Sequence, residues 1–163
     1  MNPKNSPPLT FRPATDSDCR LVWTWANDPA LLAHTFRTHE PIPWETHQKW
    51  YKTTLLGTTR HLYIAEHDGL PAGYVRFEDN HLGEPEISVY LAPPCRGRHL
   101  SAPLINDGTR HHLLLHPDPR PMTAWVRIEN APSLAAFRSA GWHPDPTPAP
   151  YLTFPAYRFV FPA

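Results

Sequence analysis

The most informative stretch of this 163-residue sequence reads Ile87-Ser88-Val89-Tyr90-Leu91-Ala92-Pro93-Pro94-Cys95-Arg96-Gly97-Arg98-His99-Leu100-Ser101-Ala102. It predicts a strand that Pro93-Pro94 ends, a basic glycine turn, and a helix over 100–115 with Pro103 in its first turn. A strand that leads into a helix in this way gathers unpaired backbone N–H groups and the positive end of the helix dipole, a combination that binds phosphate. Arg96 and Arg98 would add positive charge. The spacing alone is equally compatible with a solvated basic turn before an ordinary helix.

The segments before this stretch predict a series of antiparallel strands. Residues 61–66 and 72–77 are rich in β-forming residues and are joined across Asp68-Gly69, a hairpin signal. Residues 86–91 follow the turn Gly83-Glu84-Pro85 as a third strand of this series. Further upstream the sequence predicts a short strand at 9–12, a helix with Leu21, Val22 and Trp25 on one face, a short helix at 30–33 and a helix from Pro43 to Gly57.

The segments after the central stretch predict a strand, a helix and a strand. Residues 122–128 favour a strand, and Asn130 caps a helix that Gly141 ends. Residues 151–161 form the last predicted strand, after a proline-rich loop at 143–150. In chain order, these elements predict a mixed α/β sheet with a βαβ crossover in its middle.

Composition indicates one folded domain and argues against several function classes. Hydrophobic residues make up 40% of the chain and charged residues 18%, and 163 residues fit a single domain over 1–163, with a flexible start at 1–8. The 15 Lys and Arg residues balance the 15 Asp and Glu residues, so we expect no general attraction to nucleic acid or to an anionic membrane. Neither an export signal nor a membrane span is recognised, and the expected location is cytoplasmic.

The cysteines and histidines form no metal-binding or redox motif. Cys19 and Cys95 are the two cysteines, and their spacing implies neither a disulfide framework nor a structural metal. Eleven histidines are present, including His111-His112, but none has a metal-ligand spacing, so we expect no metal cofactor. Hydrolase, NTPase and dehydrogenase motifs are lacking as well.

The central stretch resembles the pyrophosphate loop of the GNAT superfamily, the acyl-CoA-dependent N-acyltransferases, whose signature is Arg/Gln-x-x-Gly-x-Gly/Ala. Arg96 matches its first position and Gly97 is a frequent neighbour, while His99 and Ser101 stand where glycines are expected. If those two residues have φ below zero, the loop N–H groups would still point correctly. The resemblance implies an α/β (α+β) fold with a GNAT-like, mostly antiparallel central sheet of six or seven strands flanked by helices.

A second segment, Asn130-Ala131-Pro132-Ser133-Leu134-Ala135-Ala136-Phe137-Arg138-Ser139-Ala140-Gly141-Trp142, is similar to another family pattern, Asn-x-x-(Ala/Ser)-x-x-x-(Tyr/Phe)-x-x-x-Gly-Phe. In the family the asparagine lies near the pantetheine arm of the cofactor, and a tyrosine at the position of Phe137 often protonates the departing thiolate. Because phenylalanine has no such proton, Tyr90 and Ser139 are the candidate donors. The resemblance therefore implies acetyl-CoA as co-substrate, held by residues of both segments: Leu91, Ala92, Arg96, Gly97, Arg98, His99, Leu100, Ser101, Ala102, Asn130, Ser133 and Phe137.

The amino-terminal half is similar to one branch of the family, which acetylates the 4-amino group of UDP-linked amino sugars in pseudaminic acid synthesis. The matching segments are residues 22–29, 35–37, 42–50 and 73–77, which contain a Trp-x-Asn-x-Pro, Glu-x-His-x-x-Trp, Gly-x-x-Arg-Phe series. The resemblance implies a pocket for the acceptor amine, with candidate residues Trp23, Asn27, Phe36, Arg37, His47 and Arg76. Packing is an open alternative for the aromatic residues of this half, and His47 fits a structural role equally well.

The implied reaction is the attack of an unprotonated amine on a thioester, which needs a base and an N–H group that polarises the carbonyl oxygen. Strand alternation places Glu86, Ser88 and Tyr90 on one face. In the family a carboxylate on this strand serves as the base, which makes Glu86 the first candidate and Glu84 the reserve; Glu86 could also be a plain strand residue. The oxyanion donor of the family would be the backbone N–H of Leu91 or Ala92.

The sequence thus indicates an acetyl-CoA-dependent N-acetyltransferase for a small-molecule amine, as a monomer or homodimer, with a nucleotide-linked amino sugar as the expected acceptor. Two alternatives stay open. One is an acetyltransferase for another amine, such as an aminoglycoside or a protein N-terminus. The other is a non-catalytic acyl-CoA-binding domain, which the residues at 99, 101 and 137 would suit.

Overall fold

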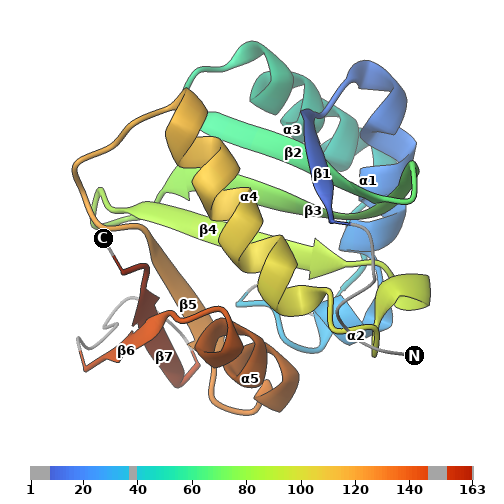
Figure 1. Ribbon diagram of the computed structural model, residues 1–163. Helices are drawn as coiled ribbons and strands as arrows, with labels where there is room; N and C mark the ends of the chain where they lie inside the picture. The colour runs from blue at the N-terminus through green and yellow to red at the C-terminus, as the bar shows by residue number, and fades with distance from the viewer. Residues whose placement is uncertain (1–7, 37–39, 147–153, 163) are drawn as a thin grey trace.

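The computed structural model describes residues 8–36, 40–146 and 154–162. Their strands form one sheet of seven in the order β1-β2-β3-β4-β5-β7-β6 (Figure 1). The strands are β1 (Thr10–Pro13), β2 (Arg60–His67), β3 (Leu70–Asp79), β4 (Pro85–Leu91), β5 (Thr123–Arg127), β6 (His143–Asp145) and β7 (Ala156–Val160). The helices are α1 (Cys19–Ala26), α2 (Pro29–Leu32), α3 (Trp44–Leu56), α4 (Ser101–Leu115) and α5 (Ala131–Ser139), with 3₁₀ turns at Asp16–Asp18 and Pro93–Cys95.

The predicted mixed sheet with a central crossover is confirmed. Strands β4 and β5 are parallel and α4 connects them, whereas every other pair of neighbours is antiparallel. Pro103 lies in the first turn of α4, where a missing N–H removes no helical hydrogen bond. Asp68 and Gly69 both have positive φ, 54° and 74°, as a two-residue hairpin turn between β2 and β3 requires.

The proline-rich carboxy-terminal region differs from its predicted loop. Residues 143–145, expected to belong to a loop over 143–150, form the edge strand β6, which pairs with β7. A strand of three residues is too short to show a clear alternation of apolar and polar residues in the sequence. Its hydrogen bonds are with β7, which lies further along the chain. Residues 147–153, and with them the predicted start of the last strand at 151, lie outside the described residues, as does the chain start over 1–7.

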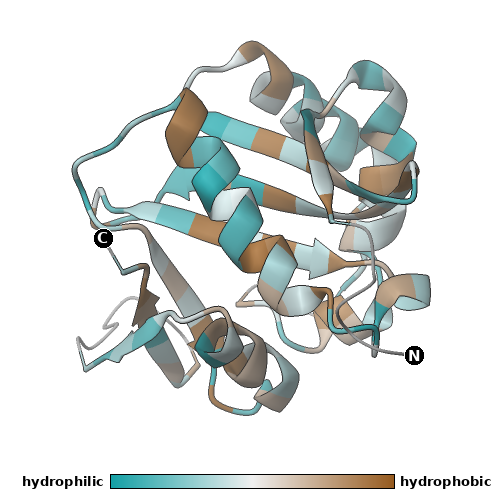
Figure 2. Cartoon of the chain, in the orientation of Figure 1, coloured by the Kyte–Doolittle hydropathy of each residue, from teal (hydrophilic) through white to brown (hydrophobic). Residues whose placement is uncertain are grey.

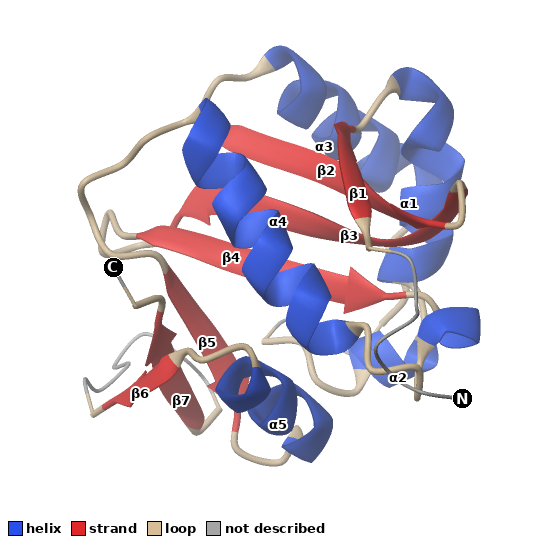
Figure 3. Cartoon of the chain, in the orientation of Figure 1, coloured by secondary structure: helices blue, strands red, loops and turns tan. Residues whose placement is uncertain are grey.

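Helices cover both faces of the sheet (Figure 3). The core on one face joins the sheet to α4 and α5, through residues such as Leu104, Ile105 and Phe137. The core on the other face joins it to α1 and α3, through Val22 and Tyr51 among others. Figure 2 shows the matching alternation of apolar and polar residues along the strands. Each described helix is too short or too polar to cross a membrane.

Strand β4 leaves β5 soon after the two strands meet. In the described chain, Glu86 opposite Thr123 is the register pair that joins them, and the strands then diverge (Figure 1). On its other edge β4 pairs with β3 from Asp79–Pro85 to Gly73–Leu91. The carboxy-terminal half of β4 therefore has a hydrogen-bonding neighbour on one edge alone.

Gly73 allows the close approach of β3 to the end of β4. A Cβ atom at this position would collide with the backbone carbonyl oxygen of Tyr90 and would lie 3.2 Å from the Cα of Leu91. Backbone atoms cannot move aside as a flexible side chain can, so a larger residue here must shift β3 or β4.

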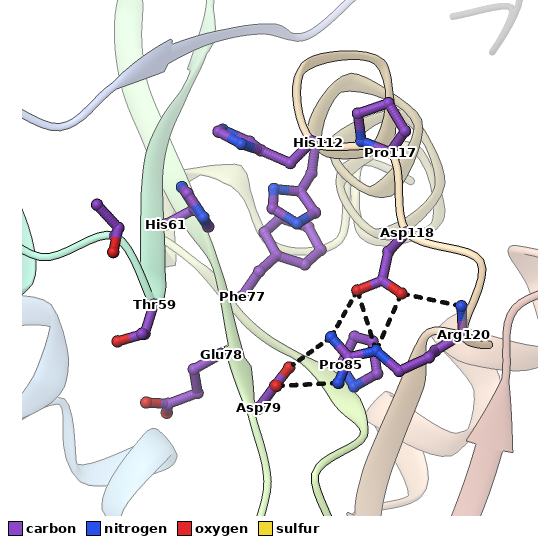
Figure 4. Close-up of a pocket in the computed structure, with 12 residues that line it drawn as sticks. Thr59, His61, Phe77, Glu78, Asp79, Pro85, His112, Pro117, Asp118 and Arg120 are labelled. Atoms are coloured by element: carbon purple, nitrogen blue, oxygen red, sulfur yellow. Dashed lines mark hydrogen bonds and ion pairs between the residues drawn. The ribbon is translucent and has the colours of Figure 1, made fainter.

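A cavity of about 280 Å³ lies at the opposite end of α4 from the 92–100 loop (Figure 4). The ring of His112 stacks on Phe77 with centroids 4.0 Å apart, and His61 and His116 lie beside it, 3.8 Å from each other. Burial, together with the neighbouring imidazoles, lowers the pKa of His112 to about 4, so His112 is neutral at neutral pH.

The charged groups around this cavity are largely paired with one another. Arg120 contacts Asp79 at 3.0 Å and Asp118 at 2.6 Å, as the dashed lines in Figure 4 show. Glu78 is paired with Arg60 and Arg76. Positive and negative charges around the cavity therefore balance each other. The cavity lies beside the first residue of β4, Pro85, and not beside the half of β4 that diverges from β5.

We expect Gly73→Ala to lower the free energy of unfolding by at least about 2 kcal/mol, because the added methyl group meets backbone rather than side chain. Gly69→Ala is the control: its φ is 74° but no atom lies within 4 Å of the new methyl group, so the cost should be that of strain alone, about 1 kcal/mol. Urea unfolding of both variants tests this expectation. Equal losses for the two would contradict it.

We expect the free energy of unfolding to decrease as the pH falls from about 6.5 to about 4, because His112 is buried in its neutral form. The unfolded chain takes up this proton near pH 6.5, whereas the folded chain resists it until the pKa of about 4, so acid favours the unfolded state by on the order of 3 kcal/mol. His112→Phe, which retains the stack on Phe77, should flatten this slope in urea titrations at several pH values. The exposed His143→Asn is the control, and an unchanged slope in His112→Phe would refute the assignment.

Candidate active site

The faces of β4 separate its polar and apolar residues as predicted. Ile87 belongs to the core under α4, and Val89 and Leu91 pack against it. Tyr90 belongs to the opposite core, under α1 and α3. Glu86 and Ser88, which are half-buried, share that second face by strand alternation.

The backbone of β4 decides which N–H group could polarise a carbonyl oxygen. The N–H of Ala92 donates to the Ala72 carbonyl at 2.8 Å, so the prediction that Ala92 serves as an oxyanion donor is wrong. In an antiparallel ladder the next residue turns its N–H the other way, so Leu91 points its N–H toward the side from which β5 has diverged. Of the two candidates, only the backbone N–H of Leu91 is still available as an oxyanion donor.

The loop after β4 has the shape of an anion cradle. Gly97 and His99 have φ of 72° and 60°, and α4 starts at Ser101 without a side chain that caps its first N–H groups. An uncapped helix N-terminus favours an anion. Ser101, which is helical, meets the condition of φ below zero, but His99 does not: it adopts a left-handed conformation at a cost of about 1 kcal/mol.

Arg96 and Arg98 differ in what they contact. Arg96 Nη2 lies 2.6 Å from Asp28 Oδ2, its Nε donates to the Leu91 carbonyl at 3.0 Å, and its guanidinium lies over the Tyr90 ring. Arg98 is exposed and has no ion pair within the described chain. Arg98 is thus the freer of the two for a phosphate.

Asp28 is a member of this site that the sequence did not reveal. Its Oδ2 accepts from Arg96 and, at 2.7 Å, from the hydroxyl of Tyr90, and its Oδ1 accepts from the N–H of Ala30. Burial opposes the charge of Asp28, but these hydrogen bonds lower its pKa below the ordinary value. Burial and the bond to Asp28 raise the pKa of the Tyr90 phenol. The sequence placed Asp28 inside the matching segment 22–29 but gave it no role of its own.

The second family segment is built around a helix cap. The Oδ1 of Asn130 accepts from the N–H of Ser133 at 3.2 Å, which caps α5 as predicted. Phe137 is 3% exposed and packs against Trp142 and Phe159, so the structure places it in the core. Ser139 is exposed at the end of α5.

Two of the predicted acceptor residues hold the segment before α3. The indole N–H of Trp23 and the amide Nδ2 of Asn27 both donate to the Ile42 carbonyl, at 2.8 and 3.1 Å, and Asn27 Oδ1 accepts from the N–H of Ile42. Of the other predicted acceptor residues in this half, Phe36 is half-buried and Arg37 lies outside the described residues.

His47 is a structural residue. It is 2% exposed, its Nε2 lies 3.1 Å from the Cys19 carbonyl, and its ring packs among Trp44, Trp50 and Tyr51. Burial lowers the pKa of His47, and the contact with the Cys19 carbonyl offsets this only in part. Of the two roles left open for His47, the structure favours packing.

Charged side chains line the face of the sheet that carries Glu86. Arg76 contacts Glu78 at 2.8 Å and Ser88 at 3.2 Å, and Arg158 contacts Glu84 at 2.6 Å. Burial raises the pKa of Glu86, and nearby donors offset this only in part. Glu84, the reserve base, is held by its ion pair with Arg158.

The Nε atoms of Arg76 and Arg158 are buried, and neither has a hydrogen-bond partner among the described residues. Such unsatisfied donors cost free energy unless a ligand or water meets them. In the described segments, no group of three or more His, Cys, Asp or Glu side chains is arranged to hold a metal ion.

Comparison with known proteins agrees with this geometry. Residues 8–143 match the family model described as Acetyltransferase (GNAT) domain. YwnH of Bacillus subtilis (strain 168), named provisionally as a phosphinothricin acetyltransferase, is 26% identical over 141 residues, which cover 82% of this chain and 83% of YwnH. Among solved structures, spermidine N-acetyltransferase from Vibrio cholerae with CoA and spermine superposes with a TM-score of 0.78 at 17% identity, covering 94% of each chain.

A second solved structure, AAC(6')-Ib with ribostamycin and coenzyme A, superposes with a TM-score of 0.79 at 19% identity and covers 94% of this chain and 93% of the other. These superpositions agree with the seven-stranded, mostly antiparallel sheet and its central crossover. The family match extends from before β1 to the start of β6 and includes the loop that precedes α4. The chain therefore belongs to the GNAT family of acetyltransferases, enzymes whose acetyl donor is acetyl-CoA.

Proposed function

We propose that this enzyme transfers an acetyl group from acetyl-CoA to the primary amine of an acceptor that also carries an anionic group, with a nucleotide-linked amino sugar as the favoured class. The observation that carries the proposal is Arg76: its side chain is 19% exposed, it contacts Glu78 and Ser88 through Nη2, and its Nε has no hydrogen-bond partner among the described residues. Arg76 shares the face that presents Glu86, whereas both Nη atoms of the buried Arg158 are paired, with Glu84 and Asp145. A phosphate of the acceptor would accept hydrogen bonds from the unused N–H donors of Arg76, which a cationic amine cannot do.

The residues around the 92–100 loop fit the cofactor. The uncapped N–H groups of Ser101 and Ala102 and the side chain of Arg98 would hold the diphosphate. The Nδ2 of Asn130 would donate to the pantetheine arm while its Oδ1 caps α5. Acetyl-CoA supplies the thioester carbonyl, and the N–H of Leu91 would donate to its oxygen.

Glu86 would accept the proton of the amine through water. Leu91 is the fifth residue after Glu86, about 17 Å along the strand at about 3.4 Å per residue, so direct contact with a carbonyl held at Leu91 is excluded and the proton would need a chain of waters. A raised pKa suits a carboxylate to this role, because a stronger base accepts the proton more readily.

The departing thiolate needs little help from an acid. The Tyr90 hydroxyl donates to Asp28, and the Phe137 ring lies in the core, so neither is placed to protonate sulfur. Ser139 is the candidate that stays exposed. A thiol with an ordinary pKa of about 8.5 leaves readily as an anion near neutral pH.

We expect Glu86→Gln to lower kcat about 100-fold while the KM for acetyl-CoA stays within about twofold, because general base catalysis at the low end contributes that much. In the wild-type enzyme, kcat should fall on the acid side through a pKa above the ordinary carboxyl range, and the variant should lose this limb. Glu84→Gln is the comparison. A larger loss in Glu84→Gln than in Glu86→Gln would transfer the role to Glu84.

We expect the acceptor to be identified by turnover with a panel of a UDP-linked amino sugar, an aminoglycoside, spermidine, phosphinothricin and a peptide amine. The proposal requires kcat/KM for the UDP-linked amino sugar to exceed that for either polycation at least 100-fold, and Arg76→Gln to reduce this preference. The opposite order would refute the acceptor class. Acetyl-CoA binding in calorimetry without turnover of any amine would favour a non-catalytic acyl-CoA-binding domain.

A further inference from the structure

One carboxylate connects the cofactor loop to the acceptor side of the molecule. Asp28 lies in the turn between α1 and α2, next to Asn27, which holds the segment before α3. Its Oδ2 accepts from Arg96 Nη2 at 2.6 Å and from Tyr90 at 2.7 Å. The sequence separation is 68 residues for the first contact and 62 for the second.

We propose that Asp28 is a positioning residue: it holds Arg96, and through Arg96 the whole 92–100 loop, in the conformation that presents its N–H groups to the diphosphate of acetyl-CoA. This inference rests on the proposed use of that loop for the cofactor. Arg96 occupies the first position of the family's loop pattern. In this inference its role toward the cofactor is indirect: it connects β4 to the start of α2 and does not itself bind the diphosphate.

The loop needs such a brace because little else restrains it. Gly97 and His99 both have positive φ, and the residues between the 3₁₀ turn at Pro93–Cys95 and the start of α4 belong to no helix or strand. Arg96 restrains this segment three times, through its Nε to the Leu91 carbonyl, its Nη2 to Asp28, and its contact with the Tyr90 ring.

Asp28 is itself held firmly enough to act as an anchor. Its side chain is 11% exposed, compared with 39% for that of Arg96, so their ion pair is partly shielded from water. The bond from the Ala30 N–H to Oδ1 fixes the carboxylate plane from the α2 side. Tyr90, 4% exposed in the core, fixes it from the β4 side.

The opposite role for Asp28 gives an opposite prediction. If Arg96 were meant to bind the diphosphate directly, Asp28 would compete with the cofactor for it, and removal of the carboxylate charge would tighten acetyl-CoA binding. If Asp28 positions the loop, the same removal must weaken binding. The sign of the change therefore separates the two roles.

The test is calorimetric titration of acetyl-CoA into the full-length protein and its Asp28→Asn and Asp28→Glu variants, together with KM and kcat for the favoured amine. We expect Asp28→Asn to raise the Kd of acetyl-CoA about tenfold and to raise its KM similarly, with kcat within about threefold. Asp28→Glu, which retains the charge, should restore the Kd to within about threefold of the wild-type value. This rescue is a result that mere loss of fold would not produce.

Asp118→Asn is the matched control, because it breaks an ion pair with Arg120 of the same length, 2.6 Å, at the other end of α4. Its Kd for acetyl-CoA should equal that of the wild-type protein. An unchanged or lower Kd in Asp28→Asn would overturn the inference. Failure of the wild-type protein to bind acetyl-CoA would instead overturn the proposed function.

A second measurement keeps the inference testable if Asp28→Asn does not fold. Tyr90→Phe and Arg96→Gln each remove one of the two donors to Asp28 Oδ2. In a positioning network their effects on the Kd are coupled, so the double variant should bind more tightly than the product of the two single effects implies. Strict additivity, with no coupling between the two substitutions, would overturn the inference.

Discussion

Strand β4 has a hydrogen-bonding neighbour along its whole length on the β3 edge, but only near its beginning on the β5 edge. Because N–H groups alternate in direction along a strand, β3 accepts from every second residue and β5 would accept from the others. Once β5 diverges, Leu91 retains a backbone donor that the sheet does not use, while Ala92 is tied to Ala72. The position of the candidate oxyanion donor thus follows from the geometry of the sheet.

Strand alternation gives the two faces of the sheet a different character. The face under α4 and α5 is a continuous apolar core, into which Phe137 packs, so this position serves stability. The opposite face combines a second apolar core under α1 and α3 with the polar side chains of Glu86, Ser88, Arg76 and Arg158, and both arginines form ion pairs. The ion pairs of Arg76 with Glu78 and of Arg158 with Glu84 and Asp145 balance the charges on this face.

Several histidines of this chain are packing residues. His47 and His112 are both buried, both have lowered pKa values, and both lie against aromatic rings. An imidazole in such a place fills volume like an aromatic ring and satisfies its nitrogen locally, at the cost of acid sensitivity. His47 and His112 therefore serve packing and stability.

The local features of the chain were predictable from sequence, because each depends on residues close together in the chain. The hairpin at Asp68-Gly69, the Asn130 cap, the alternation along β4 and the helix start before α4 are all of this kind. The family resemblance likewise rested on local motifs, at 96–102 and 130–142. Tertiary structure alone decided the pairing of Asp28 with Arg96, the strand at 143–145, the burial of Phe137 and the loss of the Ala92 N–H to Ala72. Those features depend on partners that are remote in sequence, and no local periodicity encodes which partner a buried group will meet.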